Sequence, residues 1–313
     1  MTNGRVAVVG SLNCDLVMKA PRRPAPGETL LGTSFHVFVG GKGCNQAIAS
    51  ARAGAAVSMV GRIGTDAFGD MVLAKLDATS IDRTFVARDV ERRTGVADIL
   101  VDANGDNSIV VAPEANARLS ATDVALARGA ISNAAVVLLQ LEIPLATVKH
   151  AVKLARALGK TVVLNPAPAP NDPRALDDVL SDIDLLVPNH IEAAALVGVR
   201  VHDIATARDA CRALRARGAR AVIVTLGEEG AVFSNDEHDG VHVASFGVPV
   251  VDTTAAGDAF CGALAASISR GVDLARSVRF ACAAGALACT TLGAEPSLPS
   301  REAIAALTFG GAP

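Results

Sequence analysis

The stretch VDTTAAGDAFCGAL, residues 251–264, determines how the rest of the chain is interpreted. We expect a short strand that ends at Asp252, then a turn of three small residues at 255–257, then a helix. The start of such a helix binds anions, because unpaired N–H groups and the helix dipole both point at the incoming charge. Asp258 follows in the first helical turn. It either stabilises the dipole, as an ordinary N-terminal carboxylate does, or takes a proton from an attacking nucleophile.

The region upstream of this stretch alternates between strand-like and helical patterns. The apolar runs RVAVVG (5–10), AAVSMVG (55–61), VVLLQ (136–140), TVVLN (161–165) and AVIVTL (221–226) are rich in β-branched residues. Helical patterns between them open with proline or close with glycine. This alternation predicts an α/β fold in which helices cover a parallel sheet. The last third is predicted to be helical, with glycines and alanines that allow close packing.

Two segments interrupt the alternation. Residues 14–39 contain a proline-rich connection followed by the alternating stretch TLLGTSFHVFV, and residues 94–112 are predicted to form two strands around the turn Asn104-Gly105. No helical pattern separates these four short strands. We interpret them as two insertions that build a small lid sheet on a single domain spanning 1–313.

Composition excludes several classes of protein. Half of the residues are hydrophobic, 19% are charged and the net charge is −3 without a basic run, so we expect no nucleic-acid partner. No apolar run reaches the roughly 18 residues of a membrane span, and the N-terminus lacks the pattern of a secretion signal. The six cysteines form no C-x-x-C pair, which predicts free thiols and a cytoplasmic protein. His238 and His242 are interpreted as residues of a hairpin.

A second glycine-rich segment is FVGGKGCNQA, residues 38–47. Its glycines allow the backbone to approach a ligand closely, while Lys42 and Asn45 offer a charge and an amide for hydroxyls or phosphate. The segment is not a Walker A loop, because Gly43 follows the G-K pair where Ser or Thr is required. It also lacks the G-x-G-x-x-G spacing of a dinucleotide site, which disfavours a nicotinamide-dependent oxidoreductase.

Polar side chains follow several predicted strands. Asn13 and Asp15 leave the first strand with a spacing of two, Gln140 and Glu142 end another, and Asn165 ends the next. Ligands of open α/β sheets bind at the carboxyl ends of the strands, so these side chains are expected to gather at one site. Each of them, taken singly, also fits a turn or capping role.

Two further motifs remain open to a structural interpretation. Asn189 and Glu192 lie three residues apart at a helix start, which suits a hydrated Mg²⁺ near phosphate and suits a capping box equally well. TLGEEG, residues 225–230, offers a G-x-x-G loop after a strand.

In combination these segments resemble the ribokinase and phosphofructokinase-B family of sugar kinases. GGKGCNQA, QLE, LNPAPA, PNHIEA, VTLGEEG and VDTTAAGDAF carry the resemblance, which runs from about residue 5 to 300. It implies a ribokinase-like three-layer sandwich with a central, mostly parallel sheet and a β-sheet lid that also forms the contact of a homodimer. It further implies ATP-dependent phosphorylation of D-ribose at O5, giving D-ribose 5-phosphate and ADP. QLE and NPAPA favour D-ribose as the substrate; the alternative is a kinase for another sugar or a nucleoside.

The resemblance also implies roles for individual residues. Asp258 would be the general base beside an anion hole formed by Ala255, Ala256 and Gly257. The sugar would be held by Asn13, Asp15, Gly41, Lys42, Gly43, Asn45 and Glu142. The ATP site would be lined by Asn189, Thr225, Gly227, Glu228, Gly230, Gly257 and Cys282. Glu192 would organise Mg²⁺ through water, and an activating K⁺ would be bound by Asp252, Thr254, Ala288, Thr291, Gly293 and Ser297.

Three cysteines depart from the family pattern. Cys14 lies between the two polar residues of the first strand, and Cys44 stands where the family usually has alanine; both are expected to crowd the sugar. Cys282 stands near the expected adenine position, where it would loosen nucleotide preference. None of them removes a catalytic group, so a sugar-binding or regulatory protein without turnover is disfavoured.

Overall fold

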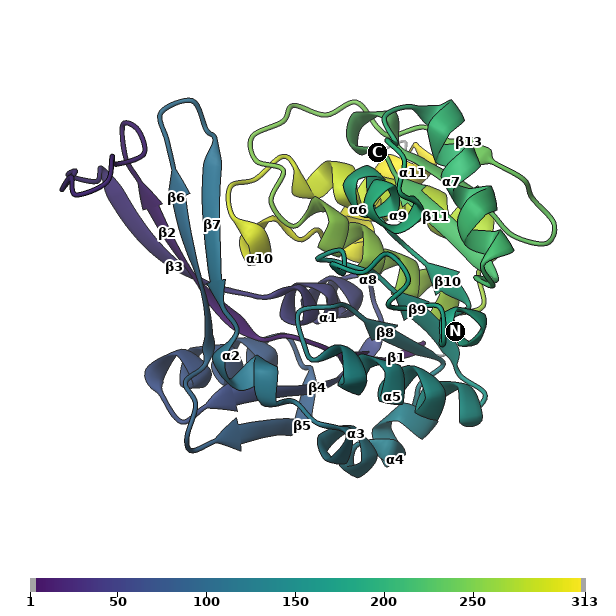
Figure 1. The fold of residues 1–313 in the computed structure, drawn as a ribbon, viewed down its shortest axis with the longest axis horizontal. Coiled ribbons are helices and arrows are strands. Elements are labelled where there is room, and N and C mark those ends of the chain that lie inside the picture. Colours follow the sequence, from purple (N-terminus) through teal and green to yellow (C-terminus); the bar gives the residue numbers. More distant parts are fainter. Residues whose placement is uncertain (1–3, 311–313) are drawn as a thin grey trace.

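A nine-stranded sheet forms the centre of the molecule in the computed structural model, which describes residues 4–310 (Figure 1). Its strand order is β13-β12-β11-β10-β9-β8-β1-β4-β5, and all neighbours pair in parallel except β11–β12 and β12–β13. The predicted, mostly parallel sheet is confirmed. Its strands are β1 (Arg5–Val9), β4 (Ala56–Gly64), β5 (Asp82–Asp89), β8 (Val136–Leu139), β9 (Thr161–Leu164), β10 (Leu185–Leu186), β11 (Ala221–Thr225), β12 (Ala231–Ser234) and β13 (Val241–Val243).

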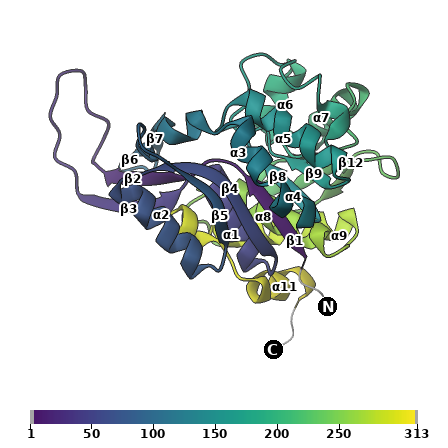
Figure 2. The ribbon, with the colours of Figure 1, turned by 90° about the horizontal axis from the view of Figure 1, so that it is seen from below.

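Helices cover both faces of this sheet, because successive side chains of a buried strand point to opposite sides. In β1, Val6 and Val8 belong to one hydrophobic core, and Ala7 and Val9 belong to the other. The first core is closed by α1 (Lys42–Arg52), α2 (Ala67–Ala78), α8 (Ala256–Ser269), α9 (Leu274–Ala288) and α11 (Arg301–Phe309). The second is closed by α3 (Ala121–Leu126), α4 (Arg128–Asn133), α5 (Leu145–Ala157), α6 (His190–Val197) and α7 (Ile204–Ala216). The view from below separates these two layers (Figure 2).

The lid is a separate sheet of four strands, as predicted from the two helix-free insertions. Its order is β3-β2-β6-β7, with β2 and β6 parallel and the outer pairs antiparallel. Figure 1 shows it standing beside the main body. Its strands are β2 (Asn13–Lys19), β3 (Ser34–Gly40), β6 (Gly95–Val101) and β7 (Asn107–Ala112).

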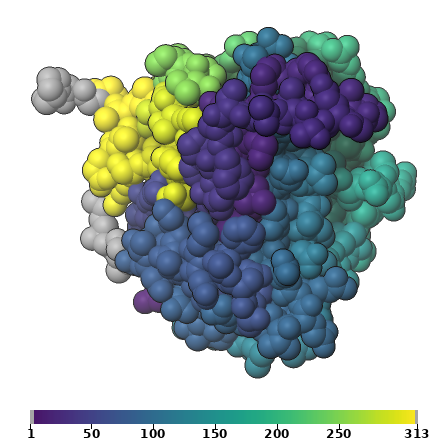
Figure 3. All heavy atoms as spheres, turned by 90° about the vertical axis from the view of Figure 1, so that its left-hand side faces the viewer, coloured from purple at the N-terminus to yellow at the C-terminus, as the bar shows by residue number. Residues whose placement is uncertain are grey.

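The lid also approaches the C-terminal part of the chain. A short helix, α10 (Ala294–Ser297), contacts β3, and a Cβ placed on Gly293 would meet the Phe38 ring at 3.5 Å. In the space-filling view, purple atoms of the first lid strands lie against yellow atoms of this C-terminal segment (Figure 3). The loop before α10 is therefore in contact with the lid.

Helices α1 and α8 pack closely through a glycine. A Cβ on Gly262 would lie 2.4 Å from the Ala49 Cβ and 2.8 Å from the Gln46 carbonyl oxygen, distances that no real side chain tolerates. The absence of a side chain lets the two backbones approach. The predicted close packing of small residues is confirmed, and it brings the N-terminal ends of α1 and α8 together.

One local prediction was wrong, and one strand was not predicted. Residues 244–255 form no strand, so none ends at Asp252; instead the amides of Val251 and Asp252 both donate to the Cys289 carbonyl at the end of α9. Helix α1 begins at Lys42, because the backbone turns into the helix directly after Gly41. Strand β5 was not predicted at all, since DRTFVARD is largely polar and lies at the sheet edge.

The predictions for the cysteines and for the histidine hairpin agree with the structure. All six cysteines are free thiols, and His242 lies in the hairpin formed by β12 and β13, with His238 in its connecting turn. Between residues 4 and 310, no helix has both the length and the apolar composition needed to cross a membrane.

Candidate active site

Asp258 lies in the first turn of α8 with only 6% of its surface exposed. Its Oδ2 accepts a hydrogen bond of 3.0 Å from the Asn45 amide, and its Oδ1 accepts one of 2.9 Å from the Gln46 amide. Burial raises the pKa of this carboxyl, while the Lys42 ammonium and the two amide donors oppose the rise. A buried carboxylate held by two donors fits a proton acceptor better than it fits a surface helix-end charge.

The turn before α8 has the open amides that the sequence predicts. Ala255 adopts φ 61°, in the left-handed region, and no side chain caps the helix. Within residues 4–310, the Ala256 amide donates to the Thr253 carbonyl at 3.3 Å, while the Gly257 amide has no hydrogen-bond acceptor. A Cβ on Gly257 would meet nothing within 4 Å. The helix start therefore opens onto empty space, as an anion site requires.

This space is a cavity of about 210 Å³ whose lining is mostly polar. The α8 turn and Asp258 form one side of it, and the start of α6 with Lys42 forms another. Burial lowers the pKa of Lys42, but the carboxylates of Asp258, Glu142 and Glu192 outweigh burial and raise it. The cavity thus combines open amides, one ammonium and two carboxylates, a set suited to a phosphate and its counter-cation.

Asn189 and Glu192 form the capping box that the sequence left open. The Asn189 side chain accepts from the Glu192 amide, and the Glu192 carboxylate accepts from the Asn189 amide, both at 2.8 Å. Glu192 is also buried and lines the 210 Å³ cavity. Burial raises the pKa of its carboxyl. The capping role is therefore present, and the same carboxylate faces the candidate phosphate site.

A second cavity, of about 710 Å³, adjoins the first. The two share Thr225, Thr253, Ala256 and Gly257. Each residue predicted to line an ATP site borders one of these cavities: Asn189 the smaller, and Thr225, Gly227, Glu228, Gly230, Gly257 and Cys282 the larger. The prediction missed the apolar part of the larger cavity, which includes Phe246, Val248, Val250 and Phe260. Three of these lie in the irregular segment 244–255, which carries no periodic signal.

Glu142 is fixed at the start of α1. Its Oε2 accepts from the Ser11 hydroxyl at 2.6 Å and from the Lys42 amide at 3.0 Å, and the Gly43 amide donates to the same hydroxyl at 3.1 Å. The glycine-rich segment and the end of β8 therefore meet, as predicted. Ser11 was not predicted, since it carries no pattern of its own.

Asn13 and Asp15 lie at the base of the lid. The Asn116 amide donates to the Asn13 Oδ1 at 2.7 Å and also bonds the Leu12 backbone, so Asn116, which the sequence analysis missed, orients Asn13. Burial, reinforced by the charges of Glu142 and Asp258, raises the pKa of Asp15 to about 7. The predicted sugar-binding carboxylates are thus close enough to influence one another's charge.

The two loops predicted to bind K⁺ lie side by side. Oδ1 of Asp252 accepts from the Thr254 amide and hydroxyl at 2.9 and 2.7 Å, and its Oδ2 accepts from the Gly293 amide at 2.8 Å. These bonds lower the pKa of Asp252 against the effect of burial. Among residues 4–310, no cluster of three or more His, Cys, Asp or Glu side chains is arranged to hold a metal ion.

The three unusual cysteines occupy different surroundings. Cys14 and Cys44 are fully buried in the core, and the Cys14 thiol donates to the Phe68 carbonyl at 3.7 Å. Burial raises the pKa of Cys14 to about 12. Of these three cysteines, Cys282 alone borders one of the two adjoining cavities.

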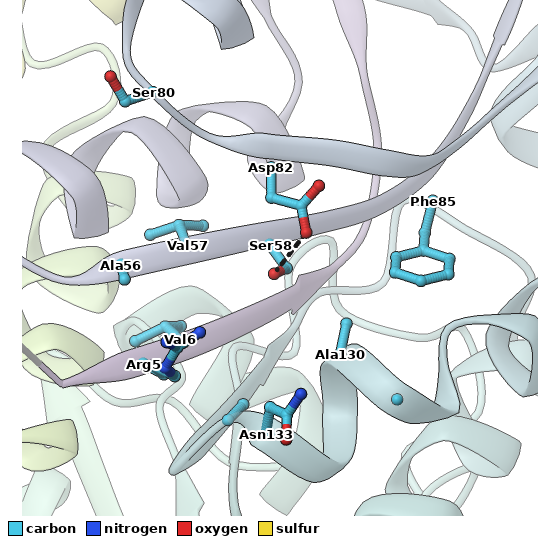
Figure 4. Close-up of a pocket in the computed structure, with 12 residues that line it drawn as sticks. Arg5, Val6, Ala56, Val57, Ser58, Ser80, Asp82, Phe85, Ala130 and Asn133 are labelled. Carbon is cyan, nitrogen blue, oxygen red and sulfur yellow. Dashed lines mark hydrogen bonds between the residues drawn. The ribbon is translucent and has the colours of Figure 1, made fainter.

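A third cavity, of about 420 Å³, lies at the amino ends of strands of the central sheet (Figure 4). It is bordered by Arg5 and Ala56, which begin β1 and β4, and by α4. Two of its polar side chains bond to each other: the Ser58 hydroxyl donates to Asp82 Oδ2 at 3.2 Å. The candidate active site is therefore at the carboxyl ends of the strands, as parallel sheets favour.

Comparison with known proteins gives a consistent result. Residues 3–301 match the model of the pfkB family of carbohydrate kinases. A ribokinase of Staphylococcus aureus is 38% identical over 306 residues, covering 97% of this chain and 99% of the relative. A deoxyribokinase of Salmonella typhi is 37% identical over 298 residues, covering 95% of this chain and 96% of that protein.

The fold is similarly matched among solved structures. The ribokinase of Arabidopsis thaliana, solved in complex with ribose and ATP, superposes with a TM-score of 0.90 at 30% identity, covering 98% of this chain and 99% of that one. The predicted ribokinase-like sandwich is confirmed. The chain belongs to the pfkB family of carbohydrate kinases.

Proposed function

We propose that this pfkB-family kinase transfers the γ-phosphoryl group of ATP to O5 of D-ribose, giving D-ribose 5-phosphate and ADP. One observation carries the proposal: the buried carboxylate of Asp258 lies beside an uncapped helix start, where two adjoining cavities meet. The similarity to ribokinases over nearly the whole chain supports the choice of substrate.

The three regions of the site suit the three parts of the reactants. The larger, more apolar cavity suits a nucleoside, and the 210 Å³ polar cavity suits its phosphates. The sugar region offers the amides and carboxylates that vicinal hydroxyls require, from Asn13, Asp15, Asn45 and Glu142. In this arrangement Asp258 lies beside the sugar hydroxyl, at the border of the polar cavity, so that O5 itself can approach the phosphoryl group.

The chemistry then follows from the side chains. Asp258 takes the proton of the O5 hydroxyl, O5 forms a bond to Pγ, and the bond from Pγ to the bridging oxygen breaks, so that ADP leaves. The open amides of Ala255 and Gly257 donate to the phosphoryl oxygens as their negative charge is redistributed. Lys42, charged and facing the same cavity, adds a further positive group.

Glu192 fits a role in holding Mg²⁺. Its carboxylate is buried, oxygen-rich and directed at the polar cavity, and Mg²⁺ is usually bound by one or two carboxylates together with water and substrate phosphates. When bound, the ion would neutralise charge on the nucleotide phosphates. Glu192 would orient one of its water ligands.

The loops at Asp252 and Gly293 fit an activating K⁺. The pKa of Asp252 is lowered, and its two oxygens already join Thr254 to Gly293. Gly293 and Thr291 lie between Ala288, which ends α9, and Ser297, which ends α10. Backbone carbonyls of those loops would complete the coordination, and the cation would stiffen the turn at 255–257. Rates measured in tetramethylammonium buffer should rise with KCl and not with NaCl, and Asp252→Ala should abolish this difference.

A panel assay tests the substrate. Purified protein with MgATP is offered D-ribose, 2-deoxy-D-ribose, a hexose and a nucleoside, and ADP release is measured; ³¹P and ¹³C NMR then locate the phosphate. We expect D-ribose to give the highest kcat/KM, with the phosphate on O5. A higher value for 2-deoxy-D-ribose would transfer the proposal to the activity named for the Salmonella relative. If none of the four compounds gave ADP release, the proposed function would be refuted.

We further propose a homodimer joined through the lid sheets, in the cytoplasm. On the lid face opposite Asp15, the side chains of Met18, Phe35 and Val110 are exposed by 42%, 54% and 71%, and β7 and β3 are free edge strands. A second lid would cover this apolar surface. Sedimentation at micromolar concentration should give a dimer, and Met18→Lys/Phe35→Lys should convert it to a monomer. Six free thiols support a reducing compartment.

A further inference from the structure

Three buried amide side chains meet next to Asp258 without a part in the proposed reaction. Gln46 of α1 and Gln140 after β8 are fully buried, and Asn165 after β9 is 8% exposed. Gln46 donates from Nε2 to Asp258 Oδ1 at 2.9 Å and to Asn165 Oδ1 at 3.1 Å, and its Oε1 accepts from Gln140 Nε2 at 2.6 Å. Both protons of the Gln46 amide are therefore used.

The orientation of this amide chain is set by a backbone carbonyl. Asn165 donates from Nδ2 to the Val187 carbonyl at 2.8 Å, and a carbonyl can only accept. The Asn165 oxygen must then face Gln46, so Gln46 must present its NH₂ group there. Its oxygen consequently faces Gln140, which supplies a donor. The direction of each hydrogen bond thus follows from the one before it.

A flipped Gln46 would lose its bonds to Asp258 and Asn165, because its oxygen would face the oxygens of both. Gln140, whose Oε1 has no partner among residues 4–310, could turn with Gln46, so the orientation of Gln46 is set by Asp258 and Asn165. Each buried polar group left without a partner costs about 1–3 kcal/mol. Gln46 is consequently held in one orientation, with a permanent donor on Oδ1 of Asp258.

The other oxygen of Asp258 has a partner of a different kind. Asn45 donates to Oδ2 at 3.0 Å, but the buried Asn45 Oδ1 has no hydrogen-bond partner among residues 4–310. No second bond therefore holds the Asn45 amide in place. The Asn45 amide is therefore held at Asp258 by one bond of its NH₂ group, whereas the Gln46 amide is held through both its NH₂ group and its oxygen.

From this asymmetry we infer that Gln46, oriented by Asn165, is a positioning residue that reserves Oδ1 of Asp258 as a hydrogen-bond acceptor and leaves Oδ2 to take the substrate proton. The inference rests on the proposed function only for the identity of the proton donor. The asymmetry itself is a property of the free protein.

The test measures the ionisation of Asp258 as well as turnover. Gln46→Met keeps the volume of the side chain and removes the donor, so the charged form of Asp258 loses a favourable bond. Difference infrared spectroscopy, with Asp258→Asn as the reference, should show the carboxyl titrating at higher pH in Gln46→Met than in the wild type. The acid limb of kcat should move the same way, and kcat should fall roughly 10–100-fold, within the usual worth of general base catalysis. KM for the sugar should change less than threefold.

Two variants separate positioning from folding. Gln140→Met contacts Gln46 and not Asp258, so it should shift the titration in the same direction by less, and it should add nothing in the double variant with Gln46→Met. Ser50→Ala removes a buried hydroxyl one turn further along α1, whose bonds go to the carbonyls of Gln46 and Gly262. It should lower the melting temperature and leave the titration of Asp258 unchanged.

The outcomes distinguish the two proposals. An unchanged infrared titration in Gln46→Met and Gln140→Met, or an equal shift in Ser50→Ala, would overturn the positioning role whatever the enzyme phosphorylates. If the variants show the predicted shifts relative to the wild type, but the wild type phosphorylates no sugar, the proposed function would be refuted and the amide chain would remain as described.

Discussion

Helices α6 and α8 both begin at the same 210 Å³ cavity, yet their first turns are built in opposite ways. In α6 the side chains of Asn189 and Glu192 satisfy each other's backbone amides. In α8 the residue at the cap is Ala255, in a left-handed conformation that costs roughly 1–2 kcal/mol, and no side chain satisfies the amides. A helix start that forgoes a cap worth about 1 kcal/mol and also accepts strain is available to a ligand.

The largest expected effect tests whether Asp258 belongs to the ligand or to the helix. Asp258→Asn keeps the shape and removes the proton acceptor, so kcat should fall by roughly 10²–10⁴ or more, with ATP binding nearly unchanged. Steady-state kinetics and nucleotide titration measure both quantities.

The matched control is Asp273→Asn. Asp273 caps α9 by accepting from the Arg276 amide, away from both cavities, and asparagine caps equally well. It should leave kcat unchanged. If Asp258→Asn retained half of the wild-type activity, Asp258 would be a helix-end carboxylate like Asp273.

The next effect concerns the open turn of α8. Gly257 has an ordinary helical backbone, and a Cβ there meets nothing within 4 Å, so Gly257→Ala should fold and should raise the free energy of unfolding by about 0.5–1 kcal/mol. The new methyl group would project beside the proposed phosphate position. We expect kcat/KM for ATP to fall roughly 10–100-fold, the order expected when a preorganised anion-binding donor is disturbed.

Gly129→Ala is the control for this substitution. Gly129 is also helical, and a Cβ there also meets nothing within 4 Å, but it lies in α4 beside the 420 Å³ cavity at the amino ends of the strands. It should give the same gain in stability without a loss of activity. Equal activities of the two alanine variants would remove the anion role from the α8 turn.

A smaller effect is expected at the capped helix. Glu192→Gln keeps an oxygen that can accept from the Asn189 amide, so the capping box and the melting temperature should be nearly unchanged. The loss of charge should raise the Mg²⁺ concentration for half-maximal rate, roughly threefold to tenfold, because one charged oxygen near the metal is lost. Rates are measured against free Mg²⁺ at fixed ATP. An unchanged titration would leave Glu192 with the capping role alone.

The two helix starts also show what a sequence can predict about this molecule. The strands of β-branched residues, the lid around Asn104-Gly105 and the turn at 255–257 each depend on neighbours in sequence, and all were predicted. The partners of the site were not: Ser11 bonds Glu142 across 131 positions, and Asn116 bonds Asn13 across 103. Such contacts depend on how distant strand ends align, which no local pattern records.

The local patterns were also ambiguous where one residue serves two purposes. The spacing of Asn189 and Glu192 fits a capping box and a metal site, and the structure contains the cap while directing the same carboxylate at the cavity. The strand expected before Asp252 is absent for a related reason. Its β-branched residues Val250 and Val251 are exposed, and Val250 borders the larger cavity instead of joining a sheet.

The smallest expected effects concern stability and compare the two helix starts directly. Asn189→Ala removes the cap of α6 and should lower the free energy of unfolding by about 1 kcal/mol. Ala255→Gly relieves the left-handed strain at α8 and should raise it by up to about 1 kcal/mol, since glycine adopts φ 61° without a steric penalty. Urea unfolding of each variant gives the change in the free energy of unfolding, with the slope of the transition as a check that the unfolded state is unaltered.

Saturating nucleotide should magnify the difference between the two helices, because a ligand that binds only the folded protein stabilises it according to its affinity. If the α8 amides hold phosphate, the added flexibility of Ala255→Gly should weaken the binding of ATP and so reduce the stabilisation that ATP provides. The variant would then be more stable than the wild type without ATP, and no more stable than the wild type when ATP is bound. A gain in stability that is the same with and without ATP would mean that the strain at Ala255 serves no ligand.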